Sequence, residues 1–82
     1  MKYLTQGHES KERIELLLKL TNIRSKAIKK SLISHFVDGV PARMAYVSQQ
    51  VDQPNFARSK KRLESVASIV EEIKELDLEK QK

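Results

Sequence analysis

The chain has no cysteine, and its 82 residues include only two glycines, two prolines and two histidines. Without cysteine it can form no disulfide, no thiolate nucleophile and no sulfur-ligated zinc site, so it needs no oxidising compartment. Two glycines are too few for a Gly-rich phosphate loop, and the histidines lack the H-x-x-x-H spacing of a helical metal site. We therefore expect no enzyme activity, no metal and no cofactor.

Long hydrophobic runs are also absent. The longest, such as Leu16-Leu17-Leu18, are far too short to span a bilayer, and residues 1–8 lack the apolar core of a signal peptide. We expect a cytoplasmic protein with no membrane partner and no small-molecule substrate. At this length the hydrophobic core is small, so the surface buried in a dimer would add useful stability.

The positive charge is concentrated in the middle of the chain. The net charge is +5, but residues 19–62 carry ten Lys or Arg against two Asp, whereas residues 63–82 carry three Lys against six acids. Concentrated positive charge is typical of nucleic-acid binders, although an acidic protein or an anionic membrane would also attract it. The acidic C-terminal segment disfavours the membrane.

Helical periodicity covers nearly all of the chain, and no segment alternates like a β-strand. We expect four helices: one from the cap Ser10 to about Thr21, one from Ser25 to Asp38 that ends at a left-handed Gly39, one over Pro41 to Gln49, and one from Asp52 to about Leu76. The predicted fold is a small all-α domain of four helices that contains a helix-turn-helix.

Within a single domain of residues 1–82, we expect four parts. These are a flexible tail (1–9), two core and oligomerisation helices (10–38), a helix-turn-helix (41–64), and a C-terminal helix extension with a frayed end (65–82). His35 lies beside the apolar stripe of the second helix, which favours a buried imidazole bonded to a neighbour over a metal ligand or a base. His8 falls in the tail.

The helix-turn-helix is predicted from the residues that begin, end and pack helices between residues 39 and 63. Ala45 is small where two helices must approach. The Asp52 carboxylate can cap the helix that begins there by accepting hydrogen bonds from backbone N–H groups of its first turn, and Phe56 begins the apolar face of that helix. Such turns usually contain glycine, whereas this one has Gln49-Gln50. That position must therefore adopt a positive φ at some cost or turn differently.

The candidate DNA contacts are the residues on the solvent side of the helix that begins at Asp52. They are Gln53, Asn55, Arg58, Lys60, Lys61 and Arg62. Arg58 is the best single candidate, because it can reach a phosphate or the negative potential of a narrow A·T-rich groove. Gln53 and Asn55 can read base edges or simply cap their own helix. Secondary phosphate contacts are assigned to Lys26, Lys29 and Lys30, which otherwise form an ordinary solvated face.

Two apolar stripes are candidates for self-association. The first helix has an inward stripe of Ile14, Leu17 and Leu18, but it is apolar on more than one side. Leu16, Leu17 and Leu20 are therefore candidates for burial against a second copy. In the fourth helix, Leu63, Val66, Val70 and Ile73 have the 3-4-3 spacing of a short helix pair. We favour dimers in solution and longer arrays on DNA.

The segment 39–66 also carries a family pattern. A Gly ends a long helix, a short helix follows, Val51 lies in the turn, and the next helix contains Asp52-Gln53, Phe56 and Arg62-Leu63 in turn. This pattern resembles the PapB/FocB-type regulators of fimbrial adhesin biosynthesis in enterobacteria, and a looser similarity extends back from Phe36 to Ile14. The resemblance implies a nucleoid-associated bacterial transcription regulator of a fimbrial or adhesin operon. It also implies oligomers on A·T-rich double-stranded DNA near the promoter, and contact through the minor groove.

The competing hypothesis is a protein-interaction module. In that case the basic all-α domain would hold an acidic partner or another regulator without touching DNA. Salt-dependent binding to duplex DNA separates the two hypotheses. In a plot of the logarithm of the binding constant against the logarithm of the salt concentration, each neutralised phosphate contributes about −0.9 to the slope.

Overall fold

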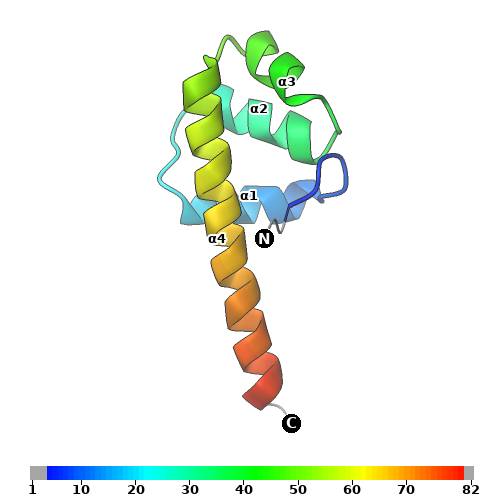
Figure 1. Ribbon diagram of the computed structural model, residues 1–82, viewed down its shortest axis with the longest axis vertical. Helices are drawn as coiled ribbons and strands as arrows, with labels where there is room; N and C mark the ends of the chain where they lie inside the picture. The colour runs from blue at the N-terminus through cyan, green and yellow to red at the C-terminus, as the bar shows by residue number, and fades with distance from the viewer. Residues whose placement is uncertain (1–3, 81–82) are drawn as a thin grey trace.

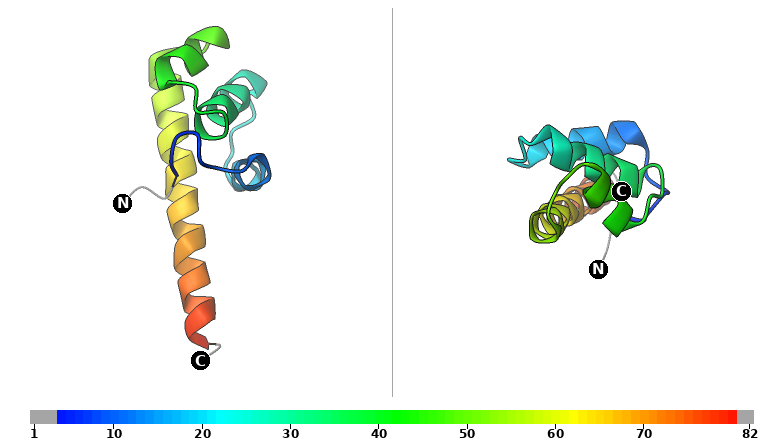
Figure 2. Two further views of the ribbon diagram at one scale, coloured as in Figure 1. Left: turned by 90° about the vertical axis from the view of Figure 1, so that its right-hand side faces the viewer. Right: turned by 90° about the horizontal axis from the view of Figure 1, so that it is seen from above.

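The computed structural model describes residues 4–80 and contains four helices over that range. They are α1 (Lys11–Leu20), α2 (Lys26–Phe36), α3 (Ala42–Ser48) and α4 (Gln53–Lys80). Helices α1 and α2 cross α4 on one side, α3 lies beside the start of α4, and the C-terminal part of α4 extends past the other helices (Figures 1 and 2). No strand is present in residues 4–80. The predicted all-α fold of four helices is confirmed.

Serine caps begin the first two helices: Ser10 is the predicted cap, and Ser25 caps the helix that was predicted to begin there. The Ser10 hydroxyl accepts the Arg13 N–H at 3.1 Å, and the Ser25 hydroxyl accepts the Ile28 N–H at 3.3 Å. Each bond satisfies a backbone donor that has no partner within the helix. Helix α1 ends at Leu20, and the hydroxyl of the C-cap residue Thr21 donates to the Leu18 carbonyl at 2.7 Å.

Two predicted helix ends are wrong by a few residues. Helix α2 ends at Phe36 instead of Asp38, although Gly39 has the predicted left-handed conformation with φ of +77°. Helix α4 runs to Lys80 instead of Leu76. The acidic and basic residues at its end are good helix formers, and no Gly or Pro interrupts them, so the helix continues without a covering neighbour.

The core joins all four helices. Its buried apolar residues are Leu4, Ile14, Leu17, Leu18, Leu32, Phe36, Ala45, Phe56, Leu63 and Ala67. Fully burying each large apolar side chain stabilises the fold by about 1.5–3 kcal/mol. Because Phe56, Leu63 and Ala67 come from the first half of α4, the core fixes that half of the helix, whereas in the second half only the part around Val70 packs against the core. None of the described helices is both long and apolar enough to cross a membrane.

Residues 4–9 correct the prediction of a flexible tail. This segment, here called the N-terminal strap, folds back over the end of α2, with Leu4 only 4% exposed. The Gly7 N–H donates to the His35 carbonyl at 3.2 Å, and the Glu9 N–H donates to the Phe36 carbonyl at 3.1 Å. The helix end offers carbonyls without partners, and the strap satisfies them. Residues 1–3 and 81–82 lie outside the described part of the chain.

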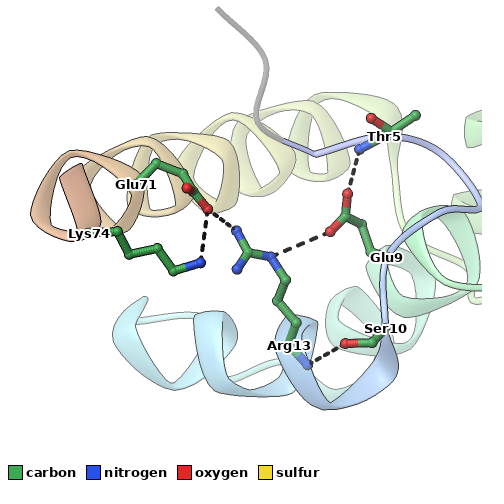
Figure 3. A network of polar contacts seen from close by, with 6 residues as sticks. All are labelled: Thr5, Glu9, Ser10, Arg13, Glu71 and Lys74. Carbon is green, nitrogen blue, oxygen red and sulfur yellow. Dashed lines mark hydrogen bonds and ion pairs between the residues drawn. The ribbon is translucent and has the colours of Figure 1, made fainter. Parts of the chain in front are cut away.

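A polar network ties α1 to α4 (Figure 3). Arg13 Nη2 donates to Glu71 Oε1 at 2.7 Å, and Arg13 Nε lies 3.5 Å from Glu9 Oε1. Lys74 Nζ lies 3.4 Å from the same Glu71 oxygen. The hydrogen bond from Arg13 lowers the pKa of Glu71, and the charge of Lys74 adds to this effect against a rise from desolvation. The network connects the strap, α1 and α4 in the middle of the long helix.

Candidate nucleic-acid interface

Of the two alternatives for the turn between α3 and α4, a positive φ or a different turn, the structure has the positive φ. Gln50 is left-handed with φ of 58°, the only such non-glycine residue among residues 4–80. The Gln50 N–H donates to the Val47 carbonyl at 3.0 Å, and the Val51 N–H donates to the Tyr46 carbonyl at 2.8 Å. A non-glycine residue in this region costs of order 1–3 kcal/mol, which the surrounding packing must offset.

Packing on both sides of the turn holds α3 against α4. Ala45 is fully buried and Phe56 is 3% exposed. The Phe56 ring lies 5.3 Å from the Tyr46 ring and 6.0 Å from the His35 ring, measured between centroids. Tyr46 is therefore accommodated beside Phe56, although it is bulky for a contact between helices. The start of α4 is thus fixed by aromatic contacts from α2 and α3.

Three of the candidate cations lie together on the outer side of α4. Arg58, Lys61 and Arg62 are exposed and line one shallow groove with Ser65 and Val66. We call Arg58, Lys61 and Arg62 the basic face. The core residues Phe56 and Leu63 hold the opposite side of the helix, so these cations point toward solvent and can meet phosphates.

A chain of side-chain hydrogen bonds leads to Arg58. Asp52 Oδ1 accepts a bond from Asn55 Nδ2 at 2.6 Å, and Asn55 Oδ1 accepts a bond from Arg58 Nη2. The prediction that the Asp52 carboxylate caps α4 through backbone N–H groups is wrong, because its bond goes to the Asn55 side chain. The Asp52 backbone carbonyl does accept the Phe56 N–H at 3.1 Å. In this state Asn55 orients Arg58 instead of projecting freely toward a base.

Lys60 departs from its neighbours. It is half-buried, its ammonium lies 6.0 Å from the centroid of the Phe36 ring, and it lines a pocket with Glu64 and the strap. The structure therefore separates Lys60 from the basic face, because its position on α4 points toward α2. Gln53, the first residue of α4, is exposed.

The predicted secondary stripe on α2 is divided as well. Lys26 and Lys30 are exposed, whereas Lys29 is half-buried and lines a groove with Glu15, Leu18 and Lys19 of α1. Lys29 therefore faces α1, and an acidic side chain shares its groove.

Sequence reasoning missed the loop between α1 and α2. Ile23 from this loop lines a groove with Asn55, Arg58, Ser59 and Arg62. Its neighbour Arg24 is exposed, as is Arg43 on α3. No local pattern could place residue 23 beside residue 58. The only available signal was the general excess of Lys and Arg over acids in residues 19–62.

His35 is a structural residue, as predicted. It is 4% exposed, and its Nδ1 lies 2.9 Å from the Val40 carbonyl oxygen, so Nδ1 carries the proton that it donates. Its ring packs edge-on against Phe36 at 4.9 Å between centroids. Within residues 4–80 no three His, Cys, Asp or Glu side chains gather to form a metal site.

The three leucines assigned to self-association have different surroundings. Leu17 is 3% exposed and belongs to the core, so it cannot also form an outer contact, and its assignment is wrong. Leu16 and Leu20 are 60% and 64% exposed. They line an apolar groove between α1 and α4 with Arg13 and Val70. Ile73, from the other predicted stripe, is 52% exposed.

The fold is shared with a protein of known structure. The crystal structure of E. coli FocB matches with a TM-score of 0.82, covering 89% of this chain and 83% of that chain at 20% sequence identity. No protein-family model matches the chain, and no curated protein matches it. The likeness to FocB that the segment 39–66 predicted is confirmed at the level of the fold.

Proposed function

We propose that this protein is a DNA-binding transcription regulator of a fimbrial or adhesin operon. The FocB fold supports the regulator class, and the basic face supports DNA as the ligand. In this proposal the protein binds A·T-rich promoter sites as an oligomer, in the bacterial cytoplasm on the nucleoid. No catalytic role is part of the proposal.

The observation that carries the proposal is the outward placement of Arg58, Lys61 and Arg62 on a helix anchored by buried Phe56. Guanidinium groups can donate two parallel hydrogen bonds to one phosphate, and they also suit the narrow minor groove of A·T tracts. Arg58 is the central contact, Asn55 sets its orientation, and Gln53 is available for a base edge. Lys26 and Lys30 supply secondary phosphate contacts, whereas Lys60 and Lys29 contribute less because both are half-buried.

Minor-groove contact is the finer part of the proposal. Proteins that bind there use Arg, Lys, Asn and Gln to read groove width and the A·T pattern. The basic face and Gln53 supply these residue types without an apolar wedge among them.

Self-association is proposed through Leu16 and Leu20. Both side chains are mostly exposed beside Val70, and a second copy that covered them would remove apolar surface from water. Dimers formed in this way leave the basic face open, because Leu16 and Leu20 lie on α1 and the basic face lies on the first half of α4.

The decisive experiment is a fluorescence-anisotropy titration of A·T-rich and G·C-rich duplexes over a series of salt concentrations. The parent should prefer the A·T-rich duplex, and Arg58→Ala should weaken that binding and reduce the salt slope by about 0.9. Lys11→Ala is the matched control, because it removes one exposed cation on α1, outside the basic face.

The interaction-module hypothesis predicts a different result. Its supporting observation is the Asp52 carboxylate, which is linked to Arg58 through Asn55 and partly offsets the charge that a phosphate would meet. Equal, weak binding to both duplexes that disappears at physiological salt, and is unaffected by Arg58→Ala, would favour that hypothesis.

A further inference from the structure

All four of the last carbonyls of α2 have partners, and the strap supplies two of them. The Ile33 carbonyl accepts the Val37 N–H at 2.8 Å, and the Ser34 carbonyl accepts the Val40 N–H at 3.1 Å. The His35 and Phe36 carbonyls accept the N–H groups of Gly7 and Glu9. Helices normally leave these carbonyls to water or to residues that follow directly in sequence. Here a distant segment completes the cap.

The two glycines of the chain, Gly7 and Gly39, lie against each other at this point. Both are left-handed, with φ of +74° and +77°. A Cβ added to Gly7 would lie 2.9 Å from the Cα of Gly39, and backbone cannot move aside as a flexible side chain can. Glycine is therefore required at residue 7 both for its conformation and for the close approach.

The loop between α2 and α3 is held from two directions. Gln6 Nε2 donates to the Gly39 carbonyl at 2.8 Å from the strap, and His35 Nδ1 donates to the Val40 carbonyl at 2.9 Å from α2. The next residue, Pro41, is the N-cap of α3, and its carbonyl accepts the Ala45 N–H at 2.9 Å. The direction of this loop therefore determines where α3 begins.

We propose that Gln6 and Gly7 are positioning residues for α3. The strap caps α2, holds the α2–α3 loop through the contact between the two glycines, and so sets α3 against α4. The turn after α3 leads into the basic face, so a displaced α3 should weaken DNA binding. Only this effect on DNA binding rests on the proposed function. The positioning role itself is a property of the free protein and can be measured without DNA.

The test is residue-resolved amide hydrogen exchange on the full chain, comparing the parent with Gly7→Ala and Gln6→Ala. The Val40 and Ala45 amides report on the loop and α3, and the Leu63 amide reports on the core of α4. Gly7→Ala should speed exchange at Val40 and Ala45 by about tenfold or more relative to Leu63, because α3 opens locally without global unfolding. Gln6→Ala removes one hydrogen bond and should give roughly a threefold change at the same amides.

The control is His8→Ala, which alters an exposed side chain of the same turn and should leave all three amides unchanged. Unchanged rates at Val40 and Ala45 would overturn the proposal. An equal increase at all three amides would also overturn it, because the strap would then add only global stability. If Gly7→Ala does not fold, the pattern in Gln6→Ala decides.

Duplex affinity is measured on the same variants at a temperature at which circular dichroism shows them folded. Gly7→Ala should bind the A·T-rich duplex several-fold more weakly than the parent. If the parent binds no duplex, the proposed function fails while the exchange data still decide the positioning role. If the parent binds and Gly7→Ala loosens α3 without any loss of affinity, the link between positioning and DNA binding is wrong.

Discussion

The two halves of α4 have the same helical geometry and opposite surroundings. Residues 53–67 are packed on the core, with Leu63 and Ala67 fully buried, whereas Ile73 and Leu76 in residues 68–80 are 52% and 59% exposed. The apolar positions continue along the helix, but the neighbouring helices do not (Figure 2). An apolar stripe in the sequence therefore identifies a helix face that another element can bury. The tertiary structure determines which part of that face is buried by helices of the same chain.

The charges of the two halves differ in the same way. Residues 53–67 carry four Lys or Arg and one Glu, whereas residues 68–80 carry two Lys and five acids. The first half combines an anchored helix with positive charge, as a phosphate-binding surface requires. The second half combines exposed apolar residues with negative charge, which DNA would repel. The helix therefore has a half suited to DNA and a half suited to solvent or protein.

The largest expected effect tests the packing of the first half. Phe56→Ala should lower the free energy of unfolding by about 3–5 kcal/mol, since it removes a buried aromatic side chain that contacts α2 and α3. Urea denaturation followed by far-UV circular dichroism measures this. Leu76→Ala, in the exposed half, should change stability by less than about 0.5 kcal/mol. Equal losses in the two variants would show that the halves are not packed differently.

The next effect separates the outward cations from the inward one. Arg62→Ala should weaken binding to all duplexes about equally and reduce the salt slope by about 0.9, because a phosphate contact is lost. Lys60→Ala should change the slope much less, since its ammonium lies over Phe36. Anisotropy titrations over a salt series provide both slopes. The same slope for Lys60→Ala and Arg62→Ala would contradict the division of the basic residues.

A smaller effect is expected for self-association. Leu20→Ala should weaken the dimer by about 1–2 kcal/mol, because it removes exposed apolar surface that lines the groove between α1 and α4. Sedimentation equilibrium measures the change in dissociation constant. Met44→Ala is the control, since Met44 is 63% exposed on α3 and does not line that groove. A weaker dimer in Met44→Ala but not in Leu20→Ala would place the interface on α3.

The smallest effect concerns the network at the junction between the two halves. The hydrogen bond from Arg13 lowers the pKa of Glu71 from 4.5, so the carboxylate adds stability above pH 4.5 and loses it as the pH falls through its folded pKa. When the pH is lowered from neutral, the Tm of the parent should therefore fall slightly more than the Tm of Glu71→Gln. Glu75→Gln, which changes an exposed carboxylate on the same helix, should behave like the parent. Thermal melts at neutral pH and below pH 4.5 test this. A constant difference between the parent and Glu71→Gln would show that Glu71 acts through packing instead of charge.

Several features were predictable because their causes lie within one or two helical turns. Ser10 and Ser25 cap α1 and α2, Gly39 is left-handed, and Gln50 takes the positive φ that was one of the two alternatives for the turn. Ala45 and Phe56 are buried at the contact between α3 and α4, as their size and spacing indicated. Each of these features depends on a few residues that are close together in the sequence, so a short sequence pattern is enough to predict it.

The errors arose where the outcome depends on segments that are distant in the chain. The strap pairs Gly7 with His35, and no periodic pattern links those positions. Leu16 and Leu17 are adjacent leucines, but only Leu17 faces the core. Lys60 and Lys61 are adjacent lysines, and the position of α2 decides that Lys60 is half-buried.

The sequence by itself determined the number and approximate positions of the helices, the serine at the start of each of the first two helices, and the separation of positive from negative charge. These properties depend on local backbone and side-chain chemistry. The tertiary structure alone decided which cations share the outer side of α4, where its apolar stripe stops being covered, and that residues 4–9 cap α2. Those outcomes require elements far apart in sequence to occupy the same space, and the free energy of burial and of satisfied backbone groups depends on which elements meet.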